Sequence, residues 1–246
     1  DMSSAAKYKF NIINSIETVR GCPFNCSFCS ATTYNGNKYR YKETSEVINE
    51  VSNWKKPDRL ALFADLNVVA NQDKAKELFH ALSKKKLMWW GSADIKVADD
   101  EETLRLLSKS GCSYLSIGVE CLSSNTLSTI NKAHNNRRDF KEVVRRLHAH
   151  NIDVFGNFIF GLDGDSKDVF EETVDFVLDT GVDFPVFQIL VPYPGTKLFE
   201  RFDKEDRLIT KDWSKYTRSD IVYRPKKMSR KQLLEGTFWA YETAYS

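Results

Sequence analysis

Three of the five cysteines of the chain lie within eight residues of one another. They occur in the segment GCPFNCSFCS, as Cys22, Cys26 and Cys29. A glycine and a proline keep the segment out of a helix, so the three thiols can converge. A structural zinc site needs four ligands, and disulfides need pairs. Three thiolates instead suit a four-iron, four-sulfur cluster in which one iron has no protein ligand and can bind an amine and a carboxylate.

Two other interpretations of these cysteines have to be weighed. In a zinc knuckle, Cys112 or a histidine would supply the fourth ligand. In a ferredoxin-like electron carrier, a fourth cysteine at a matching spacing would complete the cluster, and the chain has none. The segment also follows a predicted strand directly, as a loop at the end of a βα unit would. The spacing and this context favour the cluster with one open iron.

The composition restricts the class of protein. The 246 residues are 41% hydrophobic, which is enough to bury the core of one large domain or two small ones. With 36 basic and 34 acidic residues, the charge is balanced, which argues against a nucleic-acid partner. No apolar run approaches the roughly 18 residues of a membrane span, and the polar start is no signal peptide. We therefore expect a cytoplasmic protein without a membrane span.

Strand-like and helix-like segments alternate along the chain. Continuous apolar runs predict strands at residues 10–19, 59–64, 87–93, 113–120, 153–162 and 183–191. Apolar residues at helical spacing predict helices at residues 44–54, 71–85, 99–111, 139–151 and 166–181. Strands of this continuous apolar type belong to a parallel sheet that is covered by helices.

The repeated βα units predict an α/β fold. Six units without a glycine-rich first turn favour a partial (βα)6 TIM-like barrel over an open doubly wound sheet. We expect residues 1–210 to form this barrel and residues 211–246 to form a C-terminal extension packed on it. Within the extension, Ser229 is a good cap for a last helix. In such a barrel, functional residues gather at the carboxyl ends of the strands.

The C-x3-C-x2-C spacing, with Phe28 before the last cysteine, resembles the signature of the radical S-adenosylmethionine superfamily. The resemblance extends over nearly the whole chain, through IETVRGCPFNCSFCSATTYNGNKYRY, YLSIGVECLSSNTLSTINKAHN, NFIFGLDGDSKDVFEETVDFV and ILVPYPGTKLFE. Within the superfamily, the chain is most similar to the large group whose members often carry an N-terminal cobalamin-binding domain. The sequence contains neither such a domain nor the D-x-H-x-x-G cobalamin signature.

The resemblance implies a role for several strand-end residues. It places the three cysteines on the cluster, whose open iron is chelated by the amino and carboxylate groups of S-adenosylmethionine. Asp65 and Asn67 would hold the methionine amine, although Asp65 would equally serve as a plain helix cap. Ser92 would lie near the cofactor carboxylate, and Glu120 would face the cofactor. Cys121 follows Glu120 and is expected to be a small buried residue rather than an active-site thiol.

A second set of residues would contact the adenine. In the superfamily, a segment like GNFIFG packs an aliphatic side chain against the adenine, and here this side chain is Ile159. Gly156 and Gly161 would let the backbone approach the cofactor, and the backbone at Phe28 would meet the adenine edge. The segment at residues 192–196, PYPGT, would form a rigid turn at the barrel mouth.

The resemblance also implies the reaction. An electron from the cluster would cleave the sulfonium of S-adenosylmethionine and so start radical chemistry on an unactivated carbon, with cobalamin-linked methyl transfer as one form. A cobalamin-independent enzyme that abstracts hydrogen directly is an alternative, and a non-catalytic iron-sulfur electron-relay module is another of a different class. The expected partners are a low-potential electron donor, such as flavodoxin or ferredoxin, and an organic substrate.

Overall fold

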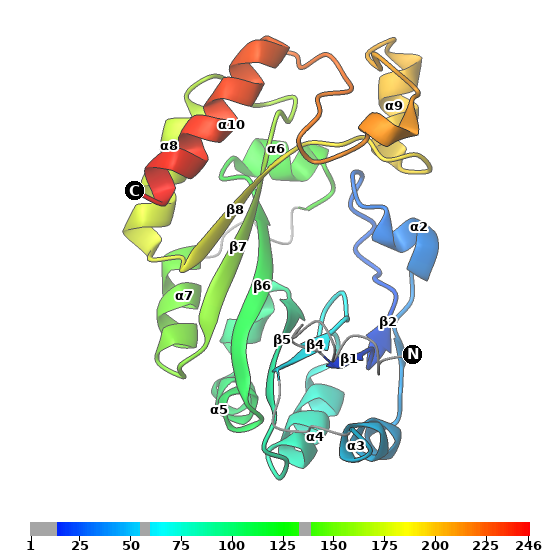
Figure 1. The fold of residues 1–246 in the computed structure, drawn as a ribbon, viewed down its shortest axis with the longest axis vertical. Coiled ribbons are helices and arrows are strands. Elements are labelled where there is room, and N and C mark those ends of the chain that lie inside the picture. The colour runs from blue at the N-terminus through cyan, green and yellow to red at the C-terminus, as the bar shows by residue number, and fades with distance from the viewer. Residues whose placement is uncertain (1–13, 55–59, 133–138) are drawn as a thin grey trace, which may run out of the picture.

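A parallel sheet of six strands organises the computed structural model, which describes residues 14–54, 60–132 and 139–246 (Figure 1). The strands are β1 (Asn14–Ile16), β4 (Leu60–Phe63), β5 (Met88–Ala93), β6 (Cys112–Glu120), β7 (Asp153–Phe160) and β8 (Phe184–Ile189), paired in this order. A doubly wound sheet would reverse its strand order at a switch point, whereas consecutive parallel strands build a barrel. The predicted partial (βα)6 barrel is confirmed.

Helices follow the strands and cover the outer face of the sheet. They are α3 (Thr44–Ser52), α4 (Gln72–Leu82), α5 (Glu101–Lys109), α7 (Phe140–His148) and α8 (Val169–Thr180). Asn71, Asp100 and Asp139 each precede a helix, and each accepts a hydrogen bond from a first-turn N–H. Such caps satisfy donors that the helix itself leaves unpaired, so the sequence fixes where these helices begin.

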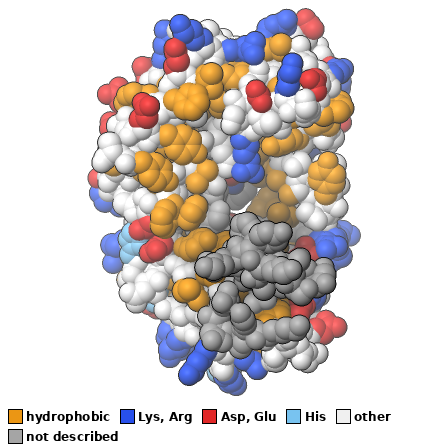
Figure 2. Space-filling model, viewed as in Figure 1, with side chains coloured by type: hydrophobic (Ala, Val, Ile, Leu, Met, Phe, Trp, Pro, Cys, Tyr) orange, Lys and Arg blue, Asp and Glu red, His pale blue; other side chains and the backbone are white. Residues whose placement is uncertain are grey.

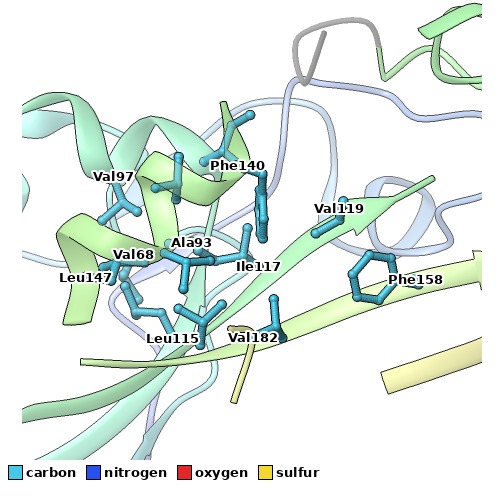
Figure 3. Packing of buried hydrophobic residues seen from close by; sticks show 14 of the residues in the cluster. Val68, Ala93, Val97, Leu115, Ile117, Val119, Phe140, Leu147, Phe158 and Val182 are labelled. Atoms are coloured by element: carbon cyan, nitrogen blue, oxygen red, sulfur yellow. The ribbon is translucent and has the colours of Figure 1, made fainter. Parts of the chain in front are cut away.

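The main hydrophobic core lies between the sheet and these helices. Leu115, Ile117 and Val119 alternate along β6 and point toward the helical layer, where Leu147 and Phe140 of α7 meet them (Figure 3). Each of these side chains is less than a tenth exposed. Burial of an aliphatic or aromatic side chain of this size contributes about 1.5–3 kcal/mol, so the outward-pointing residues carry much of the stability of the barrel.

The predicted first strand is only partly realised. Residues 10–13 lie outside the described part of the chain, and β1 ends at Ile16. Val19 and Arg20 then form β2, which leaves the main sheet and pairs with β3 (Arg40–Tyr41). The Asp65 carboxylate holds this bend, because it accepts hydrogen bonds from the backbone N–H groups of Thr18 (2.6 Å) and Val19 (3.0 Å). The β2–β3 ribbon closes the loop that carries the three cysteines.

The elements outside the barrel core are short, except for the last helix. They are α2 (Ala31–Asn35), the 3₁₀ turn Ile95–Asp99, α6 (Ser124–Thr129), α9 (Lys197–Lys204), the 3₁₀ turn Trp213–Lys215 and α10 (Arg230–Ala244). As expected, Ser229 caps α10. None of the helices among the described residues combines the length and the apolar character that a membrane span requires.

Helix α10 protects the edge strand of the sheet. It packs along α8 and β8 (Figure 1). The Phe187 N–H donates to the Tyr241 hydroxyl (3.0 Å), and the Tyr245 hydroxyl donates to the Pro185 carbonyl (2.9 Å). Edge strands expose unpaired backbone groups that invite association with other chains. The C-terminal tyrosines therefore satisfy two backbone groups on the open edge of β8, while the division of the chain at residue 210 stays a prediction.

A partly buried ion cluster ties α9 and the chain that follows it to the loop after β7. Asp163 pairs with Arg207 (2.8 Å), Arg201 (2.9 Å) and Lys226 (3.2 Å). Nearby, the Tyr223 hydroxyl donates to the Gly161 carbonyl (2.6 Å). Burial alone would raise the pKa of Asp163, but the ion pairs with Arg207 and Arg201 outweigh it and lower this pKa. Asp163 therefore stays ionised in the folded protein.

Asp165, two residues further, has the opposite shift and allows a pH test. Burial raises its pKa from 3.8 to about 6, although the Gly161 and Leu162 N–H groups both donate to it. The folded state binds this proton more tightly than the unfolded state, so stability falls as pH rises from about 4 to 6. Asp165→Asn keeps an acceptor without the charge. The unfolding free energy of this variant minus that of wild type should be about 2 kcal/mol larger at pH 7 than at pH 4.5. Urea unfolding at the two pH values measures this difference.

Asp212→Asn is the matched control. Because hydrogen bonds from Ser214 lower the pKa of Asp212, this carboxylate stays ionised throughout the range, and the difference in unfolding free energy between this variant and wild type should be the same at pH 4.5 and pH 7. A pH-independent difference for Asp165→Asn as well would contradict the assignment of the raised pKa to Asp165.

Candidate functional site

An open cavity of about 440 Å³ lies where the strands end, in the hollow near the centre of the face that Figure 2 shows. Its lining comes from the cysteine loop, from the ends of β4 to β8 and from the C-terminal extension. The lining residues are Cys22, Phe24, Cys26, Phe28, Cys29, Ser30, Ala31, Leu66, Asn67, Ser92, Ala93, Asp94, Ser116, Gly118, Glu120, Lys132, Asn157, Ile159, Gln188, Ile189, Leu190, Val191, Tyr193 and Arg218. The volume falls within the range of small-molecule sites.

The cysteine loop owes its shape to distant parts of the chain. The Ser27 N–H donates to the Ile130 carbonyl (3.0 Å), and the Leu198 N–H donates to the Ser27 carbonyl (2.8 Å). The Asn131 amide nitrogen donates to the carbonyls of Phe24 and Asn25, both at 3.0 Å. The loop is therefore fastened on one side to the end of α6 and on the other to the start of α9.

Gly21 allows the sharp entry into this loop. Its φ is +92°, and a Cβ atom there would lie 2.1 Å from the Lys38 carbonyl oxygen. A side chain at this position would therefore both strain the backbone and clash with it. The next residue, Cys22, donates its N–H to the Gly36 carbonyl (3.1 Å), which closes the loop on itself.

The three cysteines are half-buried and all line the cavity. Burial raises the pKa of the Cys22 thiol and raises that of Cys26 to about 11. Among the described residues, no group of three or more His, Cys, Asp or Glu side chains is placed to hold a single metal ion. In a cubane cluster, each cysteine binds a different iron, so three thiols that line one cavity wall without meeting at a point suit such a cluster.

The period of two along the strands selects which side chains face the cavity. On β6 these are Ser116, Gly118 and Glu120, and on β7 they are Asn157 and Ile159. The intervening residues belong to the core under the helices. The Asn157 amide nitrogen donates to the Ser116 hydroxyl (2.8 Å), so neighbouring strands present a connected polar surface at this depth.

Glu120 and Lys132 form a buried ion pair beside the cysteines. Their side chains are only 9% and 14% exposed. Burial alone would lower the pKa of Lys132, but the Glu120 carboxylate outweighs this effect and raises it. Glu120 ends β6 with a φ of 70°, a conformation that is uncommon for a residue other than glycine. A strained residue and a buried charge pair at a strand end are both typical of a functional site.

Asn67, after β4, is the centre of a second polar group. Its amide nitrogen donates to Asp94 Oδ2 (2.9 Å) and to the Tyr39 hydroxyl oxygen (3.4 Å). Its carbonyl oxygen accepts from the N–H groups of Val69 and Asp94, both at 3.2 Å. The ends of β4 and β5 and the residue before β3 are thereby joined on the wall opposite β7.

A comparison with known proteins identifies the family. Residues 16–177 match the family model of the radical SAM superfamily, named after S-adenosylmethionine. The chain belongs to this superfamily. The superfamily uses a [4Fe–4S] cluster and S-adenosylmethionine, so the predicted family and its cofactors are confirmed.

Two curated relatives are enzymes of tetrapyrrole chemistry. The bacteriochlorophyllide d C-12(1)-methyltransferase of Chlorobaculum tepidum is 34% identical over 240 residues, 96% of this chain and 52% of the relative. The anaerobic magnesium-protoporphyrin IX monomethyl ester cyclase of Cereibacter sphaeroides is 30% identical over 92% of this chain and 37% of the relative. The chain thus spans about half the length, or less, of these relatives.

A solved radical SAM structure shares the fold. The methyltransferase TsrM from Kitasatospora setae, with cobalamin and a [4Fe–4S] cluster bound, superposes with a TM-score of 0.73. The sequences are 20% identical, and the match covers 82% of this chain and 38% of TsrM. At this identity, the likeness supports the barrel architecture alone.

Most of the predicted radical SAM site residues share the cavity. Besides the three cysteines, these are Phe28, Asn67, Ser92, Glu120 and Ile159. Asp65 does not line it, because its carboxylate points toward β2 and accepts from the backbone N–H groups and the hydroxyl of that bend. Its position supports neither a contact with the methionine amine nor a helix cap, but a clamp on the chain that leads into the cysteine loop.

The two predicted glycines also lie outside the cavity lining. A Cβ atom on Gly156 would lie 2.9 Å from Val182, because this residue faces the helical layer like Phe158. A Cβ atom on Gly161 would lie 2.2 Å from the Tyr223 hydroxyl, in contact with the C-terminal extension. Both glycines allow close packing and neither lines the cavity, so their approach to the cofactor stays a prediction. Cys121 is buried and also outside the lining.

Several cavity residues were missed in the sequence. Lys132 and Arg218 follow no recognisable motif, and Arg218 comes from the C-terminal extension, to which the sequence analysis assigned no site residue. Asn157 and Gln188 could have been found, because each is a polar residue inside an otherwise apolar strand. Such a residue is costly to bury unless a polar group faces it.

The Glu120–Lys132 pair leads to a prediction on stability. Lys132→Met leaves the Glu120 carboxylate buried and unpaired, so we expect it to lower the unfolding free energy of the cluster-free protein by about 3–5 kcal/mol. The double variant Lys132→Met/Glu120→Gln should recover most of this loss, since neither charge remains. Anaerobic urea unfolding measures both. Lys42→Met, which breaks an exposed pair with Glu50, is the control and should cost at most about 1 kcal/mol. Equal losses for the single and double variants would refute the pairing.

Proposed function

We propose that this chain is the catalytic barrel of a radical SAM enzyme that acts on an unactivated carbon, with methyl transfer as its reaction. Cys22, Cys26 and Cys29 would hold the cluster, and S-adenosylmethionine would bind at the iron that they leave open. The observation that carries the proposal is the placement of the three thiols on one wall of the cavity at the strand ends. The enzymatic character of the relatives supports it.

The remaining walls offer the groups that the cofactor requires. A methionine moiety has an ammonium and a carboxylate, and the cavity presents the Glu120 carboxylate beside the Lys132 ammonium. We assign the cofactor's charged groups to this pair and to Asn67 and Ser92 on the strands opposite. Ile159 and Phe28 are the apolar residues at the depth where an adenine would pack. Bound here, the cluster and S-adenosylmethionine would supply the radical, while the protein orients them and excludes water.

The substrate would be a large and mostly apolar organic compound with an anionic group. Leu190, Val191 and Tyr193 give the cavity an apolar side near α9, and Arg218 adds a guanidinium to its lining. Arginine is well suited to bind a carboxylate. A tetrapyrrole fits this description, and two relatives are named for tetrapyrrole substrates. The reaction also requires a low-potential electron donor, such as flavodoxin or ferredoxin, and a reducing compartment such as the cytoplasm, which suits the free thiols.

Loss of any one cluster cysteine should abolish the function. After anaerobic reconstitution, wild-type protein should contain about four irons per chain and cleave S-adenosylmethionine when reduced. Cys22→Ala, Cys26→Ala and Cys29→Ala should each lose the cleavage, measured as 5′-deoxyadenosine by chromatography. Cys112→Ala is the control, because this thiol is buried at the opposite end of β6 and should leave cleavage intact. A wild-type protein that binds one zinc and no iron would overturn the proposal.

The role of cobalamin can be tested by the products. If methyl transfer is linked to cobalamin, S-adenosylhomocysteine should form in addition to 5′-deoxyadenosine. The S-adenosylhomocysteine should appear only when hydroxocobalamin and substrate are both present. A cobalamin-independent enzyme that abstracts hydrogen should yield 5′-deoxyadenosine whether or not hydroxocobalamin is added, without S-adenosylhomocysteine. The methyltransferase activity named for one relative is the reason to test methyl transfer first. The magnesium-tetrapyrrole substrates named for the relatives are the compounds to try first.

A further inference from the structure

The chain between α9 and α10 folds back on itself and forms an arm, residues 207–224, which is orange in Figure 1. The Arg224 N–H donates to the Arg207 carbonyl (2.9 Å), and Arg207 Nε donates back to the Arg224 carbonyl (2.9 Å). Leu208 and Tyr223 follow with an antiparallel bridge. The two ends of the arm are therefore fastened together, and the residues between them form one loop.

One carboxylate of the barrel holds both ends of the arm. Asp163, in the loop after β7, pairs with Arg207 at the start of the arm (2.8 Å) and with Lys226 two residues beyond its end (3.2 Å). The Arg207 side chain is only 9% exposed, so water and salt screen this pair little. The arm is thereby anchored to the strand whose Asn157 and Ile159 line the cavity.

The middle of the arm packs beside the cavity. Tyr216 is buried in a small apolar cluster with Val191, and the partly buried Tyr193 and Phe199 pack against this cluster. Val191 and Tyr193 themselves line the cavity. The Tyr216 hydroxyl donates to the Thr210 carbonyl within the arm (2.8 Å), so the polar end of the ring has a partner. The arm therefore rests on the cavity wall that follows β8.

Arg218 lies in a tight turn at the tip of the arm. The hydroxyl oxygen of Thr217 accepts from the N–H groups of Ser219 and Asp220, both at 3.2 Å. The same hydroxyl donates to the Asp220 carboxylate (2.6 Å). Hydroxyl groups stabilise turns in this way. The turn fixes the backbone of Arg218, whose side chain lines the cavity.

The lining of the cavity includes two cations, Lys132 and Arg218. The Lys132 ammonium is buried and already pairs with Glu120. The Arg218 guanidinium is exposed and makes no ion pair or hydrogen bond with any residue that the structure describes. An anion that enters the cavity can therefore bind Arg218 without breaking an existing pair.

We propose that this arm sets the specificity of the site: Arg218 binds a free carboxylate of the substrate, and Asp163 is the positioning residue that keeps the arm in place. The inference rests on the proposed function, which supplies the cofactor site and a tetrapyrrole as the substrate class. A guanidinium binds a carboxylate through two parallel charge-assisted hydrogen bonds. An ester has no charge and only weaker acceptors. The site therefore distinguishes a carboxylic acid from its ester.

The test measures whether the protein distinguishes such a pair. The probes are magnesium-protoporphyrin IX monomethyl ester, which keeps one free carboxylate, and the dimethyl ester, which has none. Dissociation constants are measured with the anaerobically reconstituted protein from the porphyrin absorbance, both probes in the same detergent. We expect wild type to bind the monomethyl ester about tenfold more tightly, as a hydrogen-bonded charge pair would give.

Arg218→Gln should abolish this preference, because binding of the monomethyl ester should weaken to the level of the dimethyl ester. Lys215→Gln is the matched control. This lysine is also an exposed cation of the arm, but it pairs with Asp212 (3.8 Å) and lies outside the cavity lining, so the preference should remain. A merely structural effect of Arg218→Gln would weaken binding of both porphyrins alike. That result, or an equal loss of preference in Lys215→Gln, would refute the assignment.

Asp163→Asn tests the anchor of the arm. It removes the charge that both ends share, so most of the preference should be lost while the dimethyl ester binds as it does to wild type. Asp179→Asn breaks an exposed pair with Lys141 and is the control that keeps the preference. Should Asp163→Asn fail to fold, Lys226→Gln removes only an exposed partner of Asp163 and must lower the preference as well. An unchanged preference in the variant that folds would contradict the role of Asp163.

The outcomes for wild type separate this inference from the proposed function. If wild type forms the cluster and cleaves S-adenosylmethionine but binds the two porphyrins equally, or binds neither, the inference is wrong and the proposed function stands. If wild type forms no cluster, the proposed function is overturned and the inference with it.

Discussion

The site depends on backbone hydrogen bonds that hold the cysteine loop from two distant elements. Ser27 lies between the Ile130 carbonyl on one side and the Leu198 N–H on the other. A loop with three cysteines and no fourth ligand has little local means of fixing its thiols, because its helix α2 is only five residues long. The thiols can therefore take their positions only once α6 and α9 are in place.

The buried charges in the cavity also depend on residues that are distant in the sequence. A lone carboxylate at the end of β6 would be costly to bury, and Lys132 compensates it from a segment that is twelve residues away in the chain. The pair brings no net charge to the cavity, yet it offers one group of each sign. This is the combination that an amino acid moiety needs, since its ammonium and carboxylate must both exchange water for protein partners.

The fold could be predicted from the sequence because its signals are local. Apolar runs, caps and strand–helix alternation are set by neighbouring residues, so the parallel barrel and the start of α10 were correct. The site could be predicted only in part. Gly156 was expected to let the backbone approach the cofactor, yet it does not line the cavity, because it lies three positions from Ile159 and residues three apart on a strand face opposite sides. Lys132 could not be found, because its role depends on a partner that tertiary structure alone brings to it.

Asp65 shows why a strand-end carboxylate is not by itself a binding residue. Its two oxygens are used by three donors at the bend between β1 and β2, and this bend directs the chain into the loop of Cys22. Asn67 follows two residues later in the loop after β4 and, unlike Asp65, lines the cavity. The short segment after β4 therefore has two roles. Asp65 fixes the path of the chain into the cysteine loop, and Asn67 joins the ends of β4 and β5 through its hydrogen bonds with Asp94. The shape of the loop entry and the polarity of one cavity wall are consequently set by the same segment.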